Sequence, residues 1–372
     1  MKGNESLRFK ERSYLCTALR AFIGGTDCPA IPEPLDWDRF ERIVAVNGLV
    51  PIIQSTLLNL SQVPENRQQT WKHASIGVLL KNRQYLKAAV KMFRILESEG
   101  IAAVSLRGLA MAYWIYPDPA LRPMSDVDIL VPTDAKEGLL DRLRLHGLSP
   151  CKIRRYQLLY EIDNCLLEIH WSYLTTKRFR KTADFGSWIA SRRQMDTSEG
   201  AIYHLTPENE LLDLICHMSL HHEMDSLLKF VDVAMLVQKE AIDWNAVRVW
   251  CEGARMTRLV HFSLAVVDHL FGTDLSSRLT SLPRHVPGKK EQMYEAYVSR
   301  LFGRDQPIYF CRRMRIMLWI AERPLPKLRQ ILRFLSLDVI GELLTLLIKR
   351  ARPLEGRYPF RNVPKEKEPS DG

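Results

Sequence analysis

The spacing of apolar and polar residues divides the chain into helical outer parts and a central part with the periodicity of strands. Three N-terminal segments carry apolar residues at intervals of three and four, as amphipathic helices do. These segments are residues 6–23, 38–60 and 66–98. Within the second segment Asn47-Gly48 precedes Pro51, which indicates that one helix ends there and another begins. A helical N-terminal region is therefore predicted over residues 1–99.

Short apolar runs replace the helical pattern in the central part of the chain. The predicted strands are residues 101–106, a run that ends at Val131, and residues 156–162 and 165–171. The last two flank Asp163-Asn164, a pair that favours a tight turn, so they should form a hairpin. With a helix over residues 108–115, the pattern predicts a βαβ unit followed by a hairpin. This would make residues 100–205 a small α/β core with a mixed sheet.

Helical patterns return on both sides of the hairpin. A helix is expected over residues 133–146, with Thr133 or Asp134 near its N-cap. After the core, Thr206 is a suitable N-cap with Pro207 in the first helical position. Further helical patterns occupy residues 225–240, 243–253, 256–271, 290–302, 308–322 and 325–350. The predicted fold class is thus α+β, with a helical C-terminal region over residues 206–353 and a charged, disordered tail over 354–372.

Composition indicates an expected cellular location but does not identify a functional site. The 372 residues carry a formal net charge of +10, and the seven cysteines are scattered and never form a C-x-x-C motif. The N-terminal stretch MKGNESLRFKERSYL is charged from Lys2 onward and contains no apolar h-region, so no signal peptide is expected. No uncharged stretch approaches the roughly 18 residues that span a bilayer. We expect a cytoplasmic protein with reduced thiols. The basic, amphipathic C-terminal helices either pack within their own domain or contact an anionic membrane surface or polyanion.

Candidate chemistry begins with two aspartates on one predicted strand. Asp126 and Asp128 are separated by one residue, so they point to the same face while Val127 and Ile129 point to the other. Two neighbouring carboxylates repel each other and resist burial, and a divalent cation such as Mg²⁺ relieves that repulsion. The alternative is a strand whose polar edge simply faces water.

Glu168 strengthens the metal-binding interpretation. It lies on a later strand of the same predicted core, and a third carboxylate there can converge on the face that carries the aspartates. Three carboxylates can hold two Mg²⁺ ions, one of which accompanies a triphosphate while the other activates an attacking hydroxyl. Asp126 and Asp128 would then bind metal, and Glu168 would bind or deprotonate the acceptor hydroxyl. His170 shares the face of Glu168 and either positions it or is a hydrogen-bonded core histidine.

These motifs resemble a known protein family. The elements L-R-G, Y-P-D-P, R-P-M-S-D-V-D-I-L-V-P and L-E-I-H-W, between about residue 40 and residue 240, are similar to the uncharacterised nucleotidyltransferase family of the DNA polymerase β-like superfamily. The resemblance implies a polymerase β-like core flanked by helices. It also implies that Asp126 and Asp128 are the metal-binding pair and that Glu168 is the third acidic position.

The resemblance extends to residues that would hold the nucleotide. Arg122 matches an arginine ahead of the aspartates and is either a phosphate clamp or a structural partner of Asp126 or Asp118. Ser125 either binds phosphate or caps the turn. Arg107-Gly108 matches a Lys-Gly pair, and arginine keeps the positive charge. The wider superfamily has Gly-Ser or Gly-Gly at this helix start, whereas Leu109 follows Gly108 here.

A second group of polar residues lies in the C-terminal region. His217 and His221 are four residues apart on a predicted helix, the spacing of a zinc pair, but no H-E-x-x-H motif is formed. The resembling family carries a histidine pair here, followed by a basic residue and an aspartate that Lys229 and Asp232 match. We expect these four to line the back of a cleft and contact nucleotide or acceptor. The alternatives are a polar network between helices and a zinc site.

The sequence therefore predicts a Mg²⁺-dependent nucleotidyltransferase. It would move a nucleoside monophosphate from a nucleoside triphosphate to an acceptor hydroxyl on an unidentified small molecule, peptide, RNA or protein. One alternative is a non-catalytic nucleotide-binding protein of the same fold. The other is an adaptor that binds a membrane surface or nucleic acid through the basic C-terminal helices.

Overall fold

The computed structural model describes residues 3–172, 185–222 and 224–278, together with residues 294, 298, 301 and 302. The chain forms two compact units, residues 1–322 and 323–372, and the second lies outside the described residues. The helical predictions for 308–322 and 325–350, most of 290–302 and the disordered tail also fall outside. The predicted domain boundaries stay predictions.

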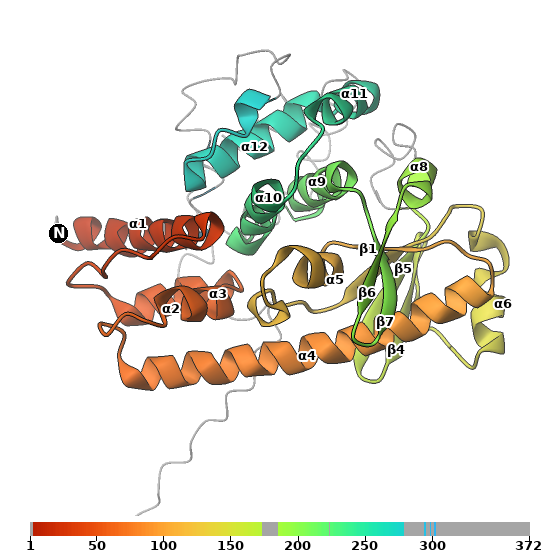
Figure 1. The fold of residues 1–372 in the computed structure, drawn as a ribbon, viewed down its shortest axis with the longest axis horizontal. Coiled ribbons are helices and arrows are strands. Elements are labelled where there is room, and N and C mark those ends of the chain that lie inside the picture. The colour runs from red at the N-terminus through yellow and green to blue at the C-terminus, as the bar shows by residue number, and fades with distance from the viewer. Residues whose placement is uncertain are drawn as a thin grey trace, which may run out of the picture. The chain divides into compact units, whose positions relative to one another are not determined.

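The predicted N-terminal helices are confirmed. They are α1 (Gly3–Gly24), α2 (Trp37–Val46), α3 (Val50–Leu57) and α4 (Glu65–Ser98). Asp36 accepts a hydrogen bond from the backbone N–H of Arg39, which caps α2, and Pro51 lies in the first turn of α3. The long helix α4 runs beside the sheet (Figure 1), and its apolar face packs on strands.

The core is a seven-stranded mixed sheet in the order β3-β4-β5-β2-β1-β7-β6. The strands are β1 (Val104–Leu106), β2 (Val127–Leu130), β3 (Lys152–Ile153), β4 (Gln157–Ile162), β5 (Cys165–His170), β6 (Arg193–Thr197) and β7 (Gly200–His204). The β4–β5 hairpin is confirmed, and Asp163 and Asn164 both have the positive φ that its tight turn requires. The mixed sheet confirms the predicted fold class.

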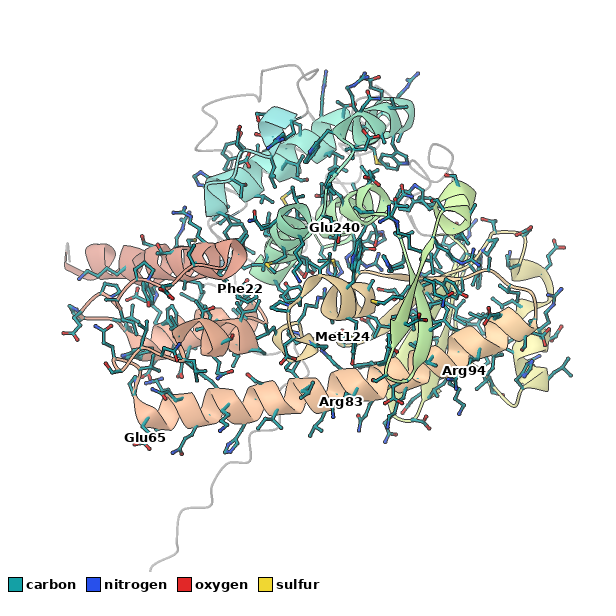
Figure 2. All side chains as sticks on the ribbon, in the orientation of Figure 1. Phe22, Glu65, Arg83, Arg94, Met124 and Glu240 are labelled. Carbon is teal, nitrogen blue, oxygen red and sulfur yellow. The ribbon has the colours of Figure 1, made fainter. Side chains whose placement is uncertain are left out.

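The connectivity within the sheet differs from the prediction in one respect. The expected βαβ unit is wrong, because β1 and β2 are antiparallel neighbours. The parallel partners are instead β2 with β5 and β1 with β7. The β6–β7 hairpin was not predicted at all, and Arg94 on α4 (labelled in Figure 2) donates a hydrogen bond of 2.9 Å to the backbone oxygen of Glu199 in its turn.

The two faces of the central strands have different partners. Val127, Ile129, Leu167 and Ile169 point to the face that α4 covers, where they join a buried apolar cluster. Burial of each such side chain contributes about 1.5–3 kcal/mol, so this face holds the sheet in place. Alternation along a strand then sends every second residue of β2 and β5 to the opposite face. That opposite face carries the polar residues described below.

Short helices connect the strands, and two of them depart from expectation. The predicted helix over 108–115 is a three-residue α5 (Gly108–Ala110) followed by the π-helix η1 (Met111–Ile115), and the 3₁₀-helix η2 is Pro119–Leu121. The helix expected from 133 is α6 (Lys136–Leu145), with Ala135 at its N-cap. Thr133 and Asp134 lie near this N-cap, as expected, but the cap residue makes no side-chain cap hydrogen bond, and the Thr133 hydroxyl donates to the backbone oxygen of Trp171.

The helices predicted after residue 206 are confirmed where the structure describes them: α9 (Pro207–Cys216), α10 (Leu227–Lys239), α11 (Trp244–Ala254) and α12 (Thr257–Phe271). Three further helical elements were not predicted as such: α8 (Phe185–Ala190), the π-helix η3 (His217–His221) and the 3₁₀-helix η4 (Ser276–Arg278). Thr206 caps α9 as expected, accepting from the backbone N–H of Asn209. In the part of the chain that the structure describes, every helix is too short or too polar to cross a bilayer.

Candidate metal and nucleotide site

Parallel pairing of β2 with β5 brings the two predicted acidic segments together. Asp128 lies directly beside Glu168 in the register, and Leu130 lies beside His170. Side chains that alternate in step on adjacent strands share a face, so Asp128, Glu168 and His170 converge. One potential ligand atom from each lies within 4.8 Å of the others. Among the described residues, this is the one group of three acidic, histidine or cysteine side chains with the geometry to hold a metal ion.

Asp126 stands next to this group, immediately before β2. Its Oδ1 accepts a hydrogen bond of 3.2 Å from the hydroxyl of Ser125, an exposed residue. The Tyr85 hydroxyl donates to the backbone oxygen of Ser125 and so holds that residue in place. Burial, together with the charges of Asp128 and Glu168, raises the pKa of Asp126 to about 6. Burial and the neighbouring carboxylates therefore favour the protonated form of Asp126 up to about pH 6.

Asp128 is held from two sides. Its Oδ1 lies 2.7 Å from Nε2 of His170, and its Oδ2 lies 2.5 Å from Nη2 of Arg107. Burial opposes ionisation of Asp128, but Arg107 and His170 outweigh it and lower the pKa well below its usual range. Asp128 is thus an ionised carboxylate whose two oxygens both have protein donors.

Arg107 connects the sheet to α9. It follows β1 with a positive φ of 51°, a conformation that non-glycine residues seldom adopt. Its backbone N–H donates to Oε1 of Glu210 at 3.0 Å, and its Nη1 lies 3.0 Å from Oδ1 of Asp213. Both acids lie on α9 and are fully buried. Burial and the neighbouring Asp213 raise the pKa of Glu210 well above its usual range.

Glu168 has a partner that sequence reasoning missed. The Gln157 side-chain amide donates to Oε2 of Glu168 at 2.5 Å, and His170 Nε2 lies 3.6 Å from the same oxygen. Gln157 is directly opposite His170 in the antiparallel β4–β5 pair. The predicted turn at Asp163-Asn164 already implied this pairing, so counting back along the hairpin could have found it.

Arg122 is buried and forms an ion pair with Asp232. Its Nη2 lies 2.8 Å from Oδ2 of Asp232, and the Tyr116 hydroxyl donates to Oδ1 of Asp232 at 2.9 Å. Both ionic side chains are buried, so Arg122 has a structural partner, but that partner is Asp232 and not Asp126 or Asp118. Gly108 packs against this pair, because a Cβ at that position would lie 3.1 Å from Nη1 of Arg122. Gly108 therefore permits close approach of α5 to the ion pair.

The histidines occupy a π-helix, a feature that the sequence pattern does not predict. The rings of His217 and His221 stack with centroids 5.6 Å apart, and Nε2 of His217 lies 3.2 Å from Nε2 of His222. Burial, with the charge of Arg107 as a second cause, lowers the pKa of His217 well below its usual range and that of His221 to about 4. These two histidines are therefore neutral near pH 7.

Lys229 completes the predicted set but does not join Asp232. Its Nζ lies 2.6 Å from Oδ1 of Asp225, whose Oδ2 lies 3.5 Å from Nδ1 of His222. Burial lowers the pKa of Lys229, while the Asp225 charge opposes that change. The electrostatic influence of Asp128 reaches both His217 and His221. The histidine segment therefore lies near the carboxylates, whereas Lys229 belongs to a separate ion pair.

Comparison with known proteins adds a family and a set of similar folds. The profile of a family described as uncharacterised nucleotidyltransferase matches residues 33–272. A nucleotidyltransferase-like antigenic protein from Paracoccidioides brasiliensis is 16% identical, over 53% of this chain and 93% of its own, with a TM-score of 0.35. ANT(2")-Ia in complex with adenylyl-2"-tobramycin is 13% identical, over 46% of this chain and 97% of its own, with a TM-score of 0.34. No curated protein matches the chain.

Proposed function

Because the chain belongs to the uncharacterised nucleotidyltransferase family, we propose that it transfers a nucleoside monophosphate from a nucleoside triphosphate to an acceptor hydroxyl. Pyrophosphate is the other product. The observation that carries this proposal is the side-by-side register of Asp128 and Glu168, with Asp126 next to them. Such a group of carboxylates matches the demand of the reaction, which consists mainly of positioning and charge neutralisation.

The residues of the site fit a divalent cation. Asp126, Asp128 and Glu168 supply the oxygen ligands that Mg²⁺ prefers, and His170 adds a nitrogen that Mn²⁺ also accepts. The raised pKa of Asp126 supports this fit, because its causes, burial and then the charges of Asp128 and Glu168, disfavour the bare carboxylate, and a bound cation would offset them. When bound, Mg²⁺ would neutralise phosphate charge and lower the pKa of the acceptor hydroxyl.

The protein groups then have separate roles in the proposed reaction. Asp126 and Asp128 hold the cation, and Glu168 receives a hydrogen bond or the proton of the acceptor hydroxyl. The side-chain amide of Gln157 holds the carboxylate of Glu168 in place, and His170, whose Nε2 contacts Asp128, lies 3.6 Å from the same carboxylate oxygen. A carboxylate held by neighbouring donors keeps one rotamer and requires little rearrangement during the reaction.

The remaining predicted residues form the walls of the proposed site. Arg107, Gly108 and Ser125 lie on the side where β1 and β2 meet the loops, and we assign them to the nucleotide. Neutral His217 and His221 face the carboxylates from the C-terminal helices and can donate or accept single hydrogen bonds. The buried Arg122–Asp232 pair and Lys229 support these walls through ion pairs within the chain.

A matched pair of variants tests the proposal. Asp128→Asn removes a proposed metal ligand, whereas Asp134→Asn changes an exposed aspartate shortly after the same strand. Each protein is incubated with Mg²⁺ and one α-³²P-labelled nucleoside triphosphate at a time, with and without an RNA and metabolite extract. Pyrophosphate release and transferred label are measured.

We expect transfer with at least one triphosphate for wild type and Asp134→Asn. Loss of the metal ligand should lower the rate on the order of a thousandfold in Asp128→Asn, since charge neutralisation supplies most of the catalysis. A folded Asp128→Asn protein that keeps the wild-type rate would show that this carboxylate does not hold the catalytic metal.

A second function, nucleotide binding without turnover, is favoured by one specific observation: both oxygens of Asp128 already have protein partners. Calorimetry with each triphosphate and Mg²⁺ separates this candidate from the enzyme, because it predicts heat of binding without pyrophosphate release. The adaptor alternative depends on C-terminal helices outside the described residues, and it stays a prediction, as does the cytoplasmic location.

A further inference from the structure

Arg107 lies between two carboxylates that belong to different parts of the fold. Its Nη2 contacts Oδ2 of Asp128 on β2 at 2.5 Å, and its Nη1 contacts Oδ1 and Oδ2 of Asp213 on α9 at 3.0 and 3.3 Å. The arginine side chain is 7% exposed, and that of Asp213 is 0% exposed. The guanidinium thus shares its charge between a proposed metal ligand and a buried acid on α9 that is not one of the proposed metal ligands.

From this arrangement we infer that Arg107 is a resident counter-cation that competes with the divalent metal for Asp128. Asp213 is the second carboxylate that keeps the guanidinium when the metal takes Asp128. The inference rests on the metal site of the proposed function. It assigns Arg107 a positioning role that controls metal affinity, in addition to the phosphate contact proposed above.

The competition follows from charge and geometry. A guanidinium and a divalent cation on one carboxylate repel each other, and a charge-assisted hydrogen bond at 2.5 Å must lengthen or break when the metal binds. Without the metal, the same contact compensates the charge of Asp128, which would otherwise have His170 as its remaining donor. Arg107 therefore keeps the site assembled while it is metal-free.

Asp213 and Glu210 lower the free-energy cost of moving the Arg107 guanidinium away from Asp128. When Nη2 leaves Asp128, Nη1 can remain with Asp213, so the buried guanidinium is never left without a carboxylate. Glu210 accepts the backbone N–H of Arg107 and fixes the residue in its positive-φ conformation. Movement is thereby confined to the outer part of the arginine side chain.

Two substitutions in the same buried pair should change metal affinity in opposite directions. Asp213→Asn removes the second carboxylate, so Arg107 interacts more strongly with Asp128. The metal should then bind several-fold more weakly. Arg107→Met combined with Asp213→Asn removes the competitor together with the buried Asp213 charge, and His170 remains as the donor to Asp128. Because a hydrogen bond to a charged group is at stake, binding should then tighten on the order of tenfold or more. A merely structural pair would weaken binding in both proteins.

The test uses the full chain and Mn²⁺ alone, with free Mn²⁺ measured by electron paramagnetic resonance. Wild type, Asp213→Asn, the double variant, Arg107→Lys and Asp128→Asn are compared after circular dichroism and urea unfolding have established folding. Arg107→Lys keeps the charge and should bind close to wild type. Opposite shifts in the first two variants support the inference. A double variant that binds no tighter than wild type, or an Asp213→Asn protein that binds more tightly, overturns it.

A measurement on wild type alone keeps the inference testable if the double variant does not fold. Mg²⁺ is titrated while the guanidinium ¹⁵N resonances of Arg107, assigned with Arg107→Lys, are followed. They should shift in step with site occupancy, and resonances that stay unchanged at saturation contradict the inference. Wild-type Mn²⁺ binding that is no stronger than that of Asp128→Asn overturns both the metal site and the inference. If the Mn²⁺ affinities of the variants change as expected but no nucleotidyl transfer is found, the proposed function alone is contradicted.

Discussion

Asp126 makes the stability of the folded protein depend on pH. Burial, Asp128 and Glu168 raise its pKa from 3.8 to about 6 in the folded protein. Between these values the folded chain holds a proton that the unfolded chain has already lost. Stability is therefore lost as the pH rises through about 6, because the ionised carboxylate of Asp126 is less stable in the folded chain than in the unfolded chain.

Asp126→Asn should consequently stabilise the metal-free protein at high pH only. We expect the free energy of unfolding to rise by about 1–2 kcal/mol near pH 8, less than the full linkage value because the side chain is partly exposed. Near pH 4 the variant and wild type should agree. Urea unfolding in the presence of a chelator measures both, and a difference that does not change with pH would show that Asp126 has an ordinary pKa.

Residue-level sequence reasoning found the carboxylates but not the groups that hold them. Asp126, Asp128 and Glu168 follow from strand alternation and one assumption about which strands are neighbours. Gln157 could have been found from the hairpin register. Asp213 could not, because an acid in an amphipathic helix ordinarily faces water, and only the packing of α9 against β1 buries it beside Arg107.

Elements with strong local signals were predicted well, and elements that depend on tertiary contacts were not. The Asp163-Asn164 turn and the Thr206 cap depend on a few adjacent residues, so the sequence alone was sufficient. Strand β6 is RQMDT, partly exposed and without apolar alternation, so it carries no strand signal of its own. Its conformation depends on pairing with β7.

The β6–β7 hairpin gives a test of how tightly it packs on α4. Gly200 has a φ of 138°, and a Cβ there would lie 2.9 Å from Cγ1 of Val90 and 2.8 Å from Nη2 of Arg94. Gly200→Ala should therefore lower the free energy of unfolding by about 1–3 kcal/mol. Gly77→Ala is the matched control, since that helical glycine has open space around its Cβ position and alanine should stabilise α4 by about 0.5–1 kcal/mol. Equal effects of the two substitutions in urea unfolding would contradict the close packing.

At the scale of the whole molecule, Asn47 joins segments that are far apart in the sequence. Its side-chain amide donates to the backbone oxygens of Ile43 and Leu301 at 2.8 and 2.9 Å. Its Oδ1 accepts from the backbone N–H of Leu227 at 2.8 Å. The last contact caps α10 from outside the helix, because the local N-cap residue, Ser226, makes no side-chain cap bond.

Asn47→Ala should therefore be costly for a single polar residue. Loss of three buried hydrogen bonds, with backbone groups left unsatisfied, should lower the free energy of unfolding by about 2–4 kcal/mol. Gln69→Ala, on an exposed part of α4, should change it by less than about 0.5 kcal/mol. Urea unfolding at one pH compares them, and a cost for Asn47→Ala as small as that of the control would remove Asn47 from this linking role.

The sequence predicted the order of helical and mixed regions but not how the sheet connects them. Pairing of β1 with β7 brings Ser105 opposite His204, and this contact across almost one hundred residues has no local signature. The parallel partnership of β2 and β5 was likewise an assumption until the register was seen. Long-range neighbours of this kind are set by the burial of whole faces, which a single sequence does not reveal.

The position of β1 between β2 and β7 also bears on truncated forms of the protein. A fragment that stops before residue 200 lacks β7 and leaves the backbone N–H and C=O groups along one side of β1 without their sheet partner. Exposed edges of that kind recruit other chains and promote aggregation. Shortened versions intended for expression should therefore retain residues 200–204, even though every proposed metal ligand precedes them.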